Sequence, residues 1–287
     1  MPEQAKTVHL RDKTYRAKRK VLDMVVRAGM GHLSSAFSCA EILTVLYYDT
    51  MNVDAHDPDW AERDRLVISK NHASIMQYPI LADLGFFDKA ELETFLAPSI
   101  GKQCNLGSHA KLSIPGIDFA GGSLGIGLGV AAGIAYAAKL DGNTHLTFCL
   151  LGDGECCEGS VWEAAMFAAH YKLSNLIAVV DRNRLAITDF TENMLALEPF
   201  MEKWQAFGWE ARTCDGHDIE KLINCLQDVR NRQSDRPLCI AANTVKGKGI
   251  DFIEDKLNWH GAAPKCNDID KAYAELERER NWYECNP

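Results

Sequence analysis

Two short polar motifs, each directly after a strand-like segment, constrain the fold of this chain more than any other feature. Residues 145–151 form a mostly apolar run of strand length that ends in Gly-Asp-Gly at 152–154. Residues 176–180 form a second such run, which ends in Asp-Arg-Asn at 181–183. Small apolar residues recur at helical spacing between the two runs. This order predicts a strand, a crossover helix and a second, parallel strand in a buried sheet.

The two polar motifs have the chemistry of a metal and phosphate site. Crossovers of this kind are right-handed, so Asp153 and Asn183 can meet at the carboxyl edge of the sheet although a whole helix separates them. Magnesium prefers near-octahedral oxygen ligation completed by phosphate oxygens and water, so one carboxylate, one amide and one backbone carbonyl suffice. Gly154 lets the backbone approach a diphosphate, and the helix start supplies free amides. A lone Gly-Asp-Gly would be a plain turn, but the second motif favours a divalent metal that carries a diphosphate.

Around these motifs the sequence resembles the transketolase family. The resemblance rests on residues 152–159 and 180–185 and on further segments in matching order, so it covers nearly the whole chain. These segments are Gly-His-Leu-Ser at 31–34, residues 63–74, Gly-Gly-Ser-Leu-Gly at 121–125, Phe-Gly-Trp-Glu at 207–210, Asp-Gly-His-Asp at 215–218, and residues 244–249 and 259–264. The resemblance implies an α/β fold that binds thiamine diphosphate, with a central, mainly parallel sheet and helices on both faces. It also implies Mg²⁺ as the metal, with Ca²⁺ or Mn²⁺ as substitutes.

The resemblance also implies roles for individual residues. The metal would be bound by Asp153, the Asn183 side chain and the Leu185 carbonyl. The cofactor would be bound by His72, Gly122, Ser123, Leu124, Gly154, Glu158, Asn183 and His260. His32, His109 and His260 would face the reacting carbon and the substrate oxygens, where groups that relay protons near neutral pH are needed. Glu158 resembles a glutamate that links paired active sites.

Several positions depart from the family pattern. Asn71 stands where a glycine is common before the histidine, Cys157 replaces a frequent glutamine, and Ala262 replaces a frequent lysine. The neighbours of His109 also differ from the family's Pro-Gly-His. The metal motif keeps its pattern, so we expect normal metal binding and an unusual substrate preference.

A partner chain is expected for this protein. Thiamine chemistry requires a glutamate on the aminopyrimidine ring, which in this family comes from a second, pyrimidine-binding domain across a subunit interface. Residues 1–287 resemble only the diphosphate-binding domain and show no match to the pyrimidine-binding or carboxyl-terminal domains. We therefore expect a single domain that acts as the amino-terminal subunit of a split transketolase. The expected assembly is a heterotetramer with two copies of each subunit.

Composition and charge limit the kinds of partner and the cellular location expected for this protein. A net charge of −9 argues against nucleic acid as a partner, while sugars and sugar phosphates stay possible because their binding sites are local. The amino terminus lacks the apolar core of a signal peptide, and the ten cysteines form no Cys-x-x-Cys pair, which predicts a cytoplasmic protein with reduced thiols. Residues 119–138 carry no charge but consist largely of Gly and Ala, which favours a buried helix over a membrane span.

Two other functions remain open at this point. A deoxyxylulose-phosphate-synthase-like enzyme, which condenses pyruvate with glyceraldehyde phosphate, shares the Gly-His-Leu-Ser-Ser segment at 31–35. Residues 63–74 and the Glu-Gly pair at 158–159 favour transketolase instead. A non-catalytic diphosphate-binding module is the second alternative, and it would bind cofactor without turnover.

Overall fold

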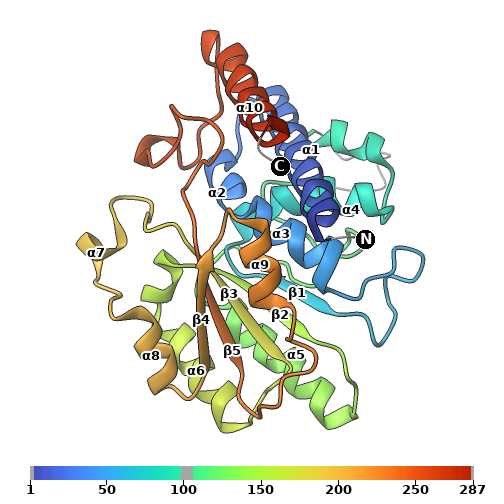
Figure 1. Ribbon diagram of the computed structural model, residues 1–287, viewed down its shortest axis with the longest axis vertical. Helices are drawn as coiled ribbons and strands as arrows, with labels where there is room; N and C mark the ends of the chain where they lie inside the picture. Colours follow the sequence, from blue (N-terminus) through green and yellow to red (C-terminus); the bar gives the residue numbers. More distant parts are fainter. Residues whose placement is uncertain (1–2, 98–105, 286–287) are drawn as a thin grey trace.

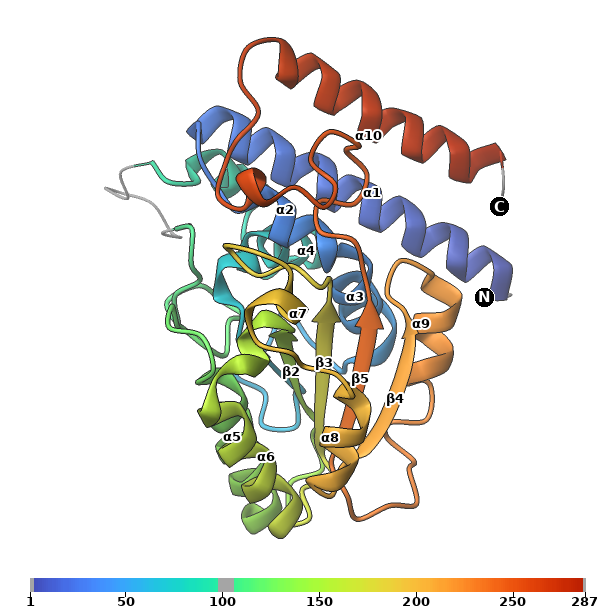
Figure 2. The ribbon, with the colours of Figure 1, turned by 90° about the vertical axis from the view of Figure 1, so that its left-hand side faces the viewer.

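A single parallel sheet forms the centre of the molecule. The computed structural model describes residues 3–97 and 106–285. Five parallel strands lie in the order β1-β2-β3-β5-β4 (Figure 1), and Figure 2 shows β2, β3, β5 and β4 side by side. They are β1 (Arg65–Ile68), β2 (Thr147–Gly152), β3 (Leu176–Arg182), β4 (Glu210–Asp215) and β5 (Leu238–Asn243). Since all strands run in one direction, their carboxyl ends share one edge.

Helices pack on both faces of this sheet, as expected. The α-helices of the described residues are α1 (Glu3–Ala28), α2 (Leu33–Ser38), α3 (Ala40–Val45), α4 (Gln77–Leu84), α5 (Gly127–Asp141), α6 (Gly159–His170), α7 (Thr191–Met194), α8 (Phe200–Ala206), α9 (Ile219–Leu226) and α10 (Asn267–Cys285). One hydrophobic core joins one face to α1, α2, α3, α4, α9 and α10, and a second core joins the opposite face to α5, α6 and α8. The sheet is therefore the middle of three layers.

Strand β2 shows why the chain folds in this way. Its side chains alternate between the faces, so that Phe148 and Leu150 enter the first core while Cys149 and Leu151 enter the second. A strand buried on both faces needs a continuous apolar run, which is the pattern that predicted it. The predicted unit of strand, helix and strand is confirmed as β2, α6 and β3, with Gly152 paired to Asp181 in the parallel register.

The carboxyl edge of the sheet lies beneath the amino-terminal helices. Figure 2 shows the arrowheads of β3 and β5 pointing toward the layer that contains α1, α2 and α10. In that layer α1 and α10 pack side by side. Segments from both ends of the chain therefore lie above the strand ends, where ligands bind in open parallel sheets.

The glycine-rich stretch near residue 127 forms a helix, as predicted, but this helix is buried along one face only. Helix α5 begins at Gly127 after a turn, and Leu128, Ala131 and Ala135 are buried in the second core. No helix within residues 3–97 and 106–285 is both long and apolar enough to cross a membrane.

Candidate active site

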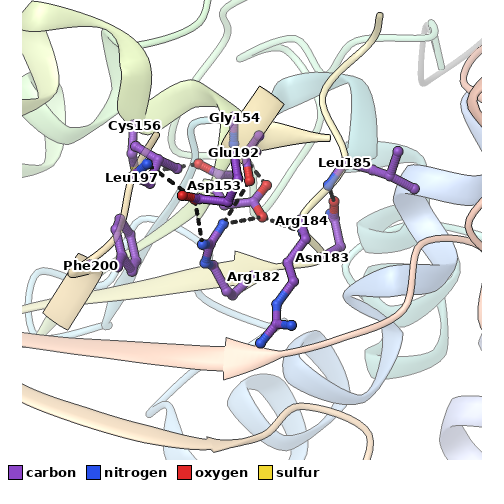
Figure 3. Close-up of polar contacts among 12 residues, drawn as sticks. Asp153, Gly154, Cys156, Arg182, Asn183, Arg184, Leu185, Glu192, Leu197 and Phe200 are labelled. Atoms are coloured by element: carbon purple, nitrogen blue, oxygen red, sulfur yellow. Dashed lines mark hydrogen bonds and ion pairs between the residues drawn. The ribbon is translucent and has the colours of Figure 1, made fainter. Parts of the chain in front are cut away.

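The two polar motifs meet at the carboxyl ends of β2 and β3. Asp153, which follows β2, is buried and accepts hydrogen bonds from the Gly154 amide at 2.7 Å and from Arg182 Nη1 at 3.1 Å. Its Oδ2 also accepts a hydrogen bond from the Arg184 amide, as Figure 3 shows. Asp153 thus contacts the residues on both sides of Asn183. The sequence prediction that these motifs lie together is confirmed.

The oxygen donors at this position suit a magnesium ion. The three proposed protein ligands are a carboxylate, an amide and a carbonyl, which is the hard donor set that Mg²⁺ prefers. The Leu185 carbonyl already accepts a hydrogen bond from a cation, the Lys246 ammonium, at 3.3 Å. Burial raises the pKa of Asp153 and Asp181 adds to the effect, whereas Arg182 opposes it. A bound cation would further favour the charged carboxylate, so the donor set fits the metal.

Arg182 was not predicted as part of this site. Its guanidinium contacts Asp153, donates to Glu198 at 2.8 Å and to Glu192 at 3.2 Å, and is itself buried. It thereby ties the segment around α7 to the metal motif (Figure 3). Charged residues directly after the apolar run at 176–180 are the sequence signal for such a buried pair, because buried charges are normally paired.

The Gly-Gly-Ser-Leu-Gly loop lies beside the Gly-Asp-Gly turn. Buried Glu155 accepts a hydrogen bond from the Gly125 amide at 2.8 Å and from the Gly152 amide at 3.1 Å, and it also accepts one from Ser69. Glu155 therefore joins β1, the turn after β2 and the glycine-rich loop. No role for Glu155 was predicted from the sequence, although a carboxylate that directly follows Gly-Asp-Gly has nearby backbone amides from which it can accept hydrogen bonds.

The remaining predicted cofactor residues border open space. Gly122 and Ser123 are exposed, Leu124 is half-buried, and a Cβ at Gly122 would meet no atom within 4 Å. Gly154 is tighter, because a Cβ there would lie 3.3 Å from the Ala186 Cβ. Glu158 is exposed at the start of α6. The loop thus offers accessible backbone beside the metal motif.

Four histidines from distant segments form one cluster. The ring centroid of His32 lies 5.2 Å from that of His72, 5.4 Å from that of His260 and 5.9 Å from that of His109. His72 and His260 are 5.3 Å apart. Nδ1 of His32 and Nδ1 of His260 are buried without a hydrogen-bond partner in the described part of the chain. Buried polar atoms are normally paired, so these two nitrogens indicate a ligand site.

These imidazoles are neutral at pH 7. Burial lowers the pKa of His260 to about 4, and Lys246 adds to the shift. Burial also lowers the pKa of His72, of His32 and of His109. A neutral imidazole has one donor and one acceptor nitrogen, so each ring is able to exchange a proton with a hydroxyl group.

Two buried lysines lie at the same edge in different surroundings. Lys70 forms an ion pair with buried Asp181 and donates to the Ser35 carbonyl at 3.2 Å. Lys246 follows β5 and donates only to the Leu185 and Ala186 carbonyls, at 3.3 and 3.4 Å, among the described residues. Burial lowers the pKa of Lys246 to about 8, and Lys70 adds to the shift. A buried ammonium that has carbonyl partners but no carboxylate is suited to an anion.

Lys246 was also missed by the sequence analysis as a site residue. The available signal was its place in residues 244–249, one of the segments that carry the family resemblance. Its lack of a carboxylate partner among the described residues depends on the fold and is not visible in the sequence.

Gly125, the last residue of the Gly-Gly-Ser-Leu-Gly loop, has a backbone conformation that strongly favours glycine. Its φ is +82°, and a Cβ would lie 2.6 Å from the Glu158 Cβ. We expect Gly125→Ala to lower the free energy of unfolding by about 2 kcal/mol or more, because strain and overlap add. Gly133→Ala is the matched control, since that glycine lies inside α5 and its Cβ would meet no atom within 4 Å. Urea unfolding should show the control unchanged or up to about 1 kcal/mol more stable; equal stability of both variants would contradict the loop geometry.

Comparison with known proteins identifies the family. The family model of the transketolase thiamine diphosphate binding domain matches residues 12–283. The chain is 38% identical to the 6-deoxy-6-sulfo-D-fructose transketolase subunit SqwG of Clostridium sp. (strain MSTE9), over 91% of this chain and 94% of that protein. It is 35% identical to an apulose-4-phosphate transketolase subunit of Phocaeicola vulgatus, over 97% of this chain and 99% of that protein.

A solved structure has the same fold. The transketolase of Campylobacter jejuni superposes with a TM-score of 0.84 and 30% sequence identity, over 94% of this chain. This chain covers 43% of that longer protein. The α/β fold, the thiamine-diphosphate-binding domain and the resemblance found in the sequence are thereby confirmed. The chain also covers nearly the whole length of the two relatives that are named as transketolase subunits. It belongs to the transketolase family of transferases and matches the thiamine-diphosphate-binding domain of that family.

Proposed function

We propose that this chain is the cofactor-binding subunit of a cytoplasmic split transketolase, which transfers a two-carbon ketol unit from a ketose donor to an aldose acceptor. The histidine cluster beside the metal motif carries this proposal. It brings neutral proton-exchanging rings to the place where a diphosphate-bearing cofactor would end. A plain diphosphate-binding module has no need of such a cluster.

Residues from both polar motifs and from the end of β5 would hold the cofactor. Asp153, Asn183 and the Leu185 carbonyl would bind Mg²⁺, and the metal would bind the diphosphate. The Lys246 ammonium would pair with the diphosphate charge, since it has no carboxylate partner among the described residues. The cofactor would also be contacted by His72, Gly122, Ser123, Leu124, Gly154, Glu158 and His260.

The histidines would exchange protons with the sugar hydroxyl and aldehyde oxygens. Bound thiamine diphosphate supplies the carbanion chemistry that cleaves and forms the carbon–carbon bond. His32, His109 and His260 would hydrogen-bond the sugar oxygens. A neutral ring would accept the proton of a donor hydroxyl while the adjacent carbon–carbon bond of the ketose breaks. The ring would then return a proton to the aldehyde oxygen of the acceptor. Their lowered pKa values keep them able to accept at pH 7.

A partner subunit would complete the active site. The two relatives that this chain covers almost end to end are named as transketolase subunits, whereas the chain covers less than half of the single-chain enzyme from Campylobacter jejuni. We infer that the partner carries the pyrimidine-binding domain with the activating glutamate, in an assembly with two copies of each chain. The relatives act on different sugars by name, so the donor is proposed only as a ketose or ketose phosphate.

Product analysis tests this function. The chain and its copurified partner, supplied with thiamine diphosphate and Mg²⁺, should lengthen an aldose phosphate by two carbons when a panel of ketose phosphates is offered. Each chain alone should be inactive. His260→Asn should lower kcat/KM by about 100-fold or more, because it removes a group that exchanges protons. Condensation of pyruvate with glyceraldehyde phosphate would instead support the synthase-like alternative, and cofactor binding without any turnover would support a non-catalytic module.

A further inference from the structure

His217 lies between the cofactor site and a buried cluster of charges. It belongs to the Asp-Gly-His-Asp turn between β4 and α9. Its Nε2 accepts a hydrogen bond from the Val245 amide at 2.8 Å, and its Nδ1 lies 2.9 Å from Glu41 Oε2. Only a neutral ring accepts at one nitrogen while it donates at the other, so Nδ1 carries the proton and donates to Glu41. Both ring nitrogens therefore have defined partners.

The Glu41 side of this arrangement is held rigidly. Glu41 lies on α3 and is buried, and it accepts a hydrogen bond from Lys18 Nζ on α1 at 2.8 Å. Although burial alone would raise the pKa of Glu41, Lys18 and His217 lower it to about 2. Glu279 on α10 lies 3.3 Å from the same ammonium. The carboxylate that orients His217 is thus ionised and is held by Lys18, whose ammonium also contacts Glu279.

A cavity borders this cluster. Its volume is about 290 Å³, and its lining includes Lys18, Glu41, His217 and Tyr283. The ring of His217 is therefore not enclosed by packing on that side. Its position depends on its two hydrogen bonds, which makes it a defined link between Glu41 and Val245.

Val245 directly precedes Lys246 in the 244–247 segment, which follows β5. Thr244 donates to Asp181, and the Gly247 amide donates to the Ser34 carbonyl at 3.0 Å. Between these two anchors, the Val245 amide lies beyond the end of β5, where the sheet offers it no partner among the described strands. His217 supplies that partner, one residue before Lys246. We propose that His217 is a positioning residue that holds the 244–247 segment and thereby directs the Lys246 ammonium toward the diphosphate; this inference rests on the proposed function.

Two substitutions of His217 separate its two hydrogen bonds. His217→Gln places an acceptor near the Nε2 position and keeps the bond to Val245. His217→Asn places a polar group near the Nδ1 position and keeps the bond to Glu41 only. We expect the asparagine variant to bind thiamine diphosphate, with Mg²⁺, about tenfold more weakly than the unchanged protein, and the glutamine variant to stay within about threefold.

The experiment is isothermal titration calorimetry of the full chain in its purified assembly, with thermal midpoints as the measure of folding. A double-mutant cycle with Lys246→Met adds a test that a purely structural role would not satisfy. If His217 acts through Lys246, His217→Asn should weaken binding little in the Lys246→Met background. Unchanged affinity of His217→Asn, or an equal loss with and without Lys246, would overturn the positioning role. No binding to the unchanged protein would refute the proposed function itself, and the positioning role with it.

Discussion

Replacing Asp153 by alanine is expected to abolish magnesium-dependent binding of thiamine diphosphate. Asp153 supplies the only carboxylate of the proposed metal site, and Mg²⁺ depends on such a charge to hold a diphosphate against water. We expect the affinity to fall by about 100-fold or more. Titration calorimetry with and without Mg²⁺ measures this directly, and the magnesium dependence itself should disappear.

The fold should survive this change. Arg182, which loses Asp153 as a partner, keeps its contacts with Glu192 and Glu198. Glu198→Ala is the matched control, because it removes another partner of the same guanidinium at an exposed position outside the metal motif. Its cofactor affinity should stay within about twofold of the unchanged protein. An Asp153→Ala variant with normal affinity would contradict the metal assignment.

Replacing Lys246 and Lys70 separately by methionine is expected to change the free energy of unfolding in opposite directions. Lys246 is buried without a carboxylate partner among the described residues, and its pKa is lowered to about 8. At pH 7, below its pKa in both the folded and the unfolded state, the ammonium is charged in both, so its full burial penalty opposes folding. We expect Lys246→Met to raise the free energy of unfolding of the cofactor-free protein by about 1–4 kcal/mol. Cofactor affinity should nevertheless fall by about 10- to 100-fold, because a charge-assisted contact to the diphosphate is lost.

Lys70→Met provides the contrast. It would leave Asp181 buried with only hydroxyl partners, from Ser38 and Thr244, among the described residues, and should lower the free energy of unfolding by about 3–5 kcal/mol. Urea unfolding of both variants without cofactor measures the two effects. Equal destabilisation by both substitutions would contradict the uncompensated burial of Lys246 and, with it, the assignment of Lys246 to the diphosphate.

Most of the sheet was predictable because its central strands are buried on both faces. Strands β2 and β3 were predicted within a few residues of their bounds, from the apolar runs at 145–151 and 176–180. Strand β4 was not predicted, because it lies at the edge of the sheet and is mostly half-exposed, with no apolar run.

One part of the site could be predicted because two sequence motifs lie at the ends of neighbouring parallel strands. Parallel strands bring Asp153 close to Asn183, and the structure confirms that meeting. The convergence of His32, His72, His109 and His260 followed from the family resemblance alone, because no spacing in the sequence relates loops from four distant segments. The roles of these residues stay predictions, while their proximity is observed.

The sequence did not reveal the roles of side chains that depend on their tertiary partners. Lys70 and Lys246 are both lysines beside strand ends in the sequence, yet one is paired with a carboxylate and the other has only carbonyl partners in the described structure. His217 is an ordinary turn residue in the sequence, and only the fold places it between Glu41 and Val245. Such pairings are tertiary and follow from the packing of segments far apart in the chain.

The central claim, that this chain holds the cofactor and a partner completes the enzyme, is tested most directly by weighing the assembly. The tagged chain is purified from its native cells with thiamine diphosphate and Mg²⁺ and measured by native mass spectrometry. We predict an assembly with two copies of this chain and two of a second chain, with cofactor retained. Recovery of this chain only with itself, even with cofactor bound, would contradict the claim.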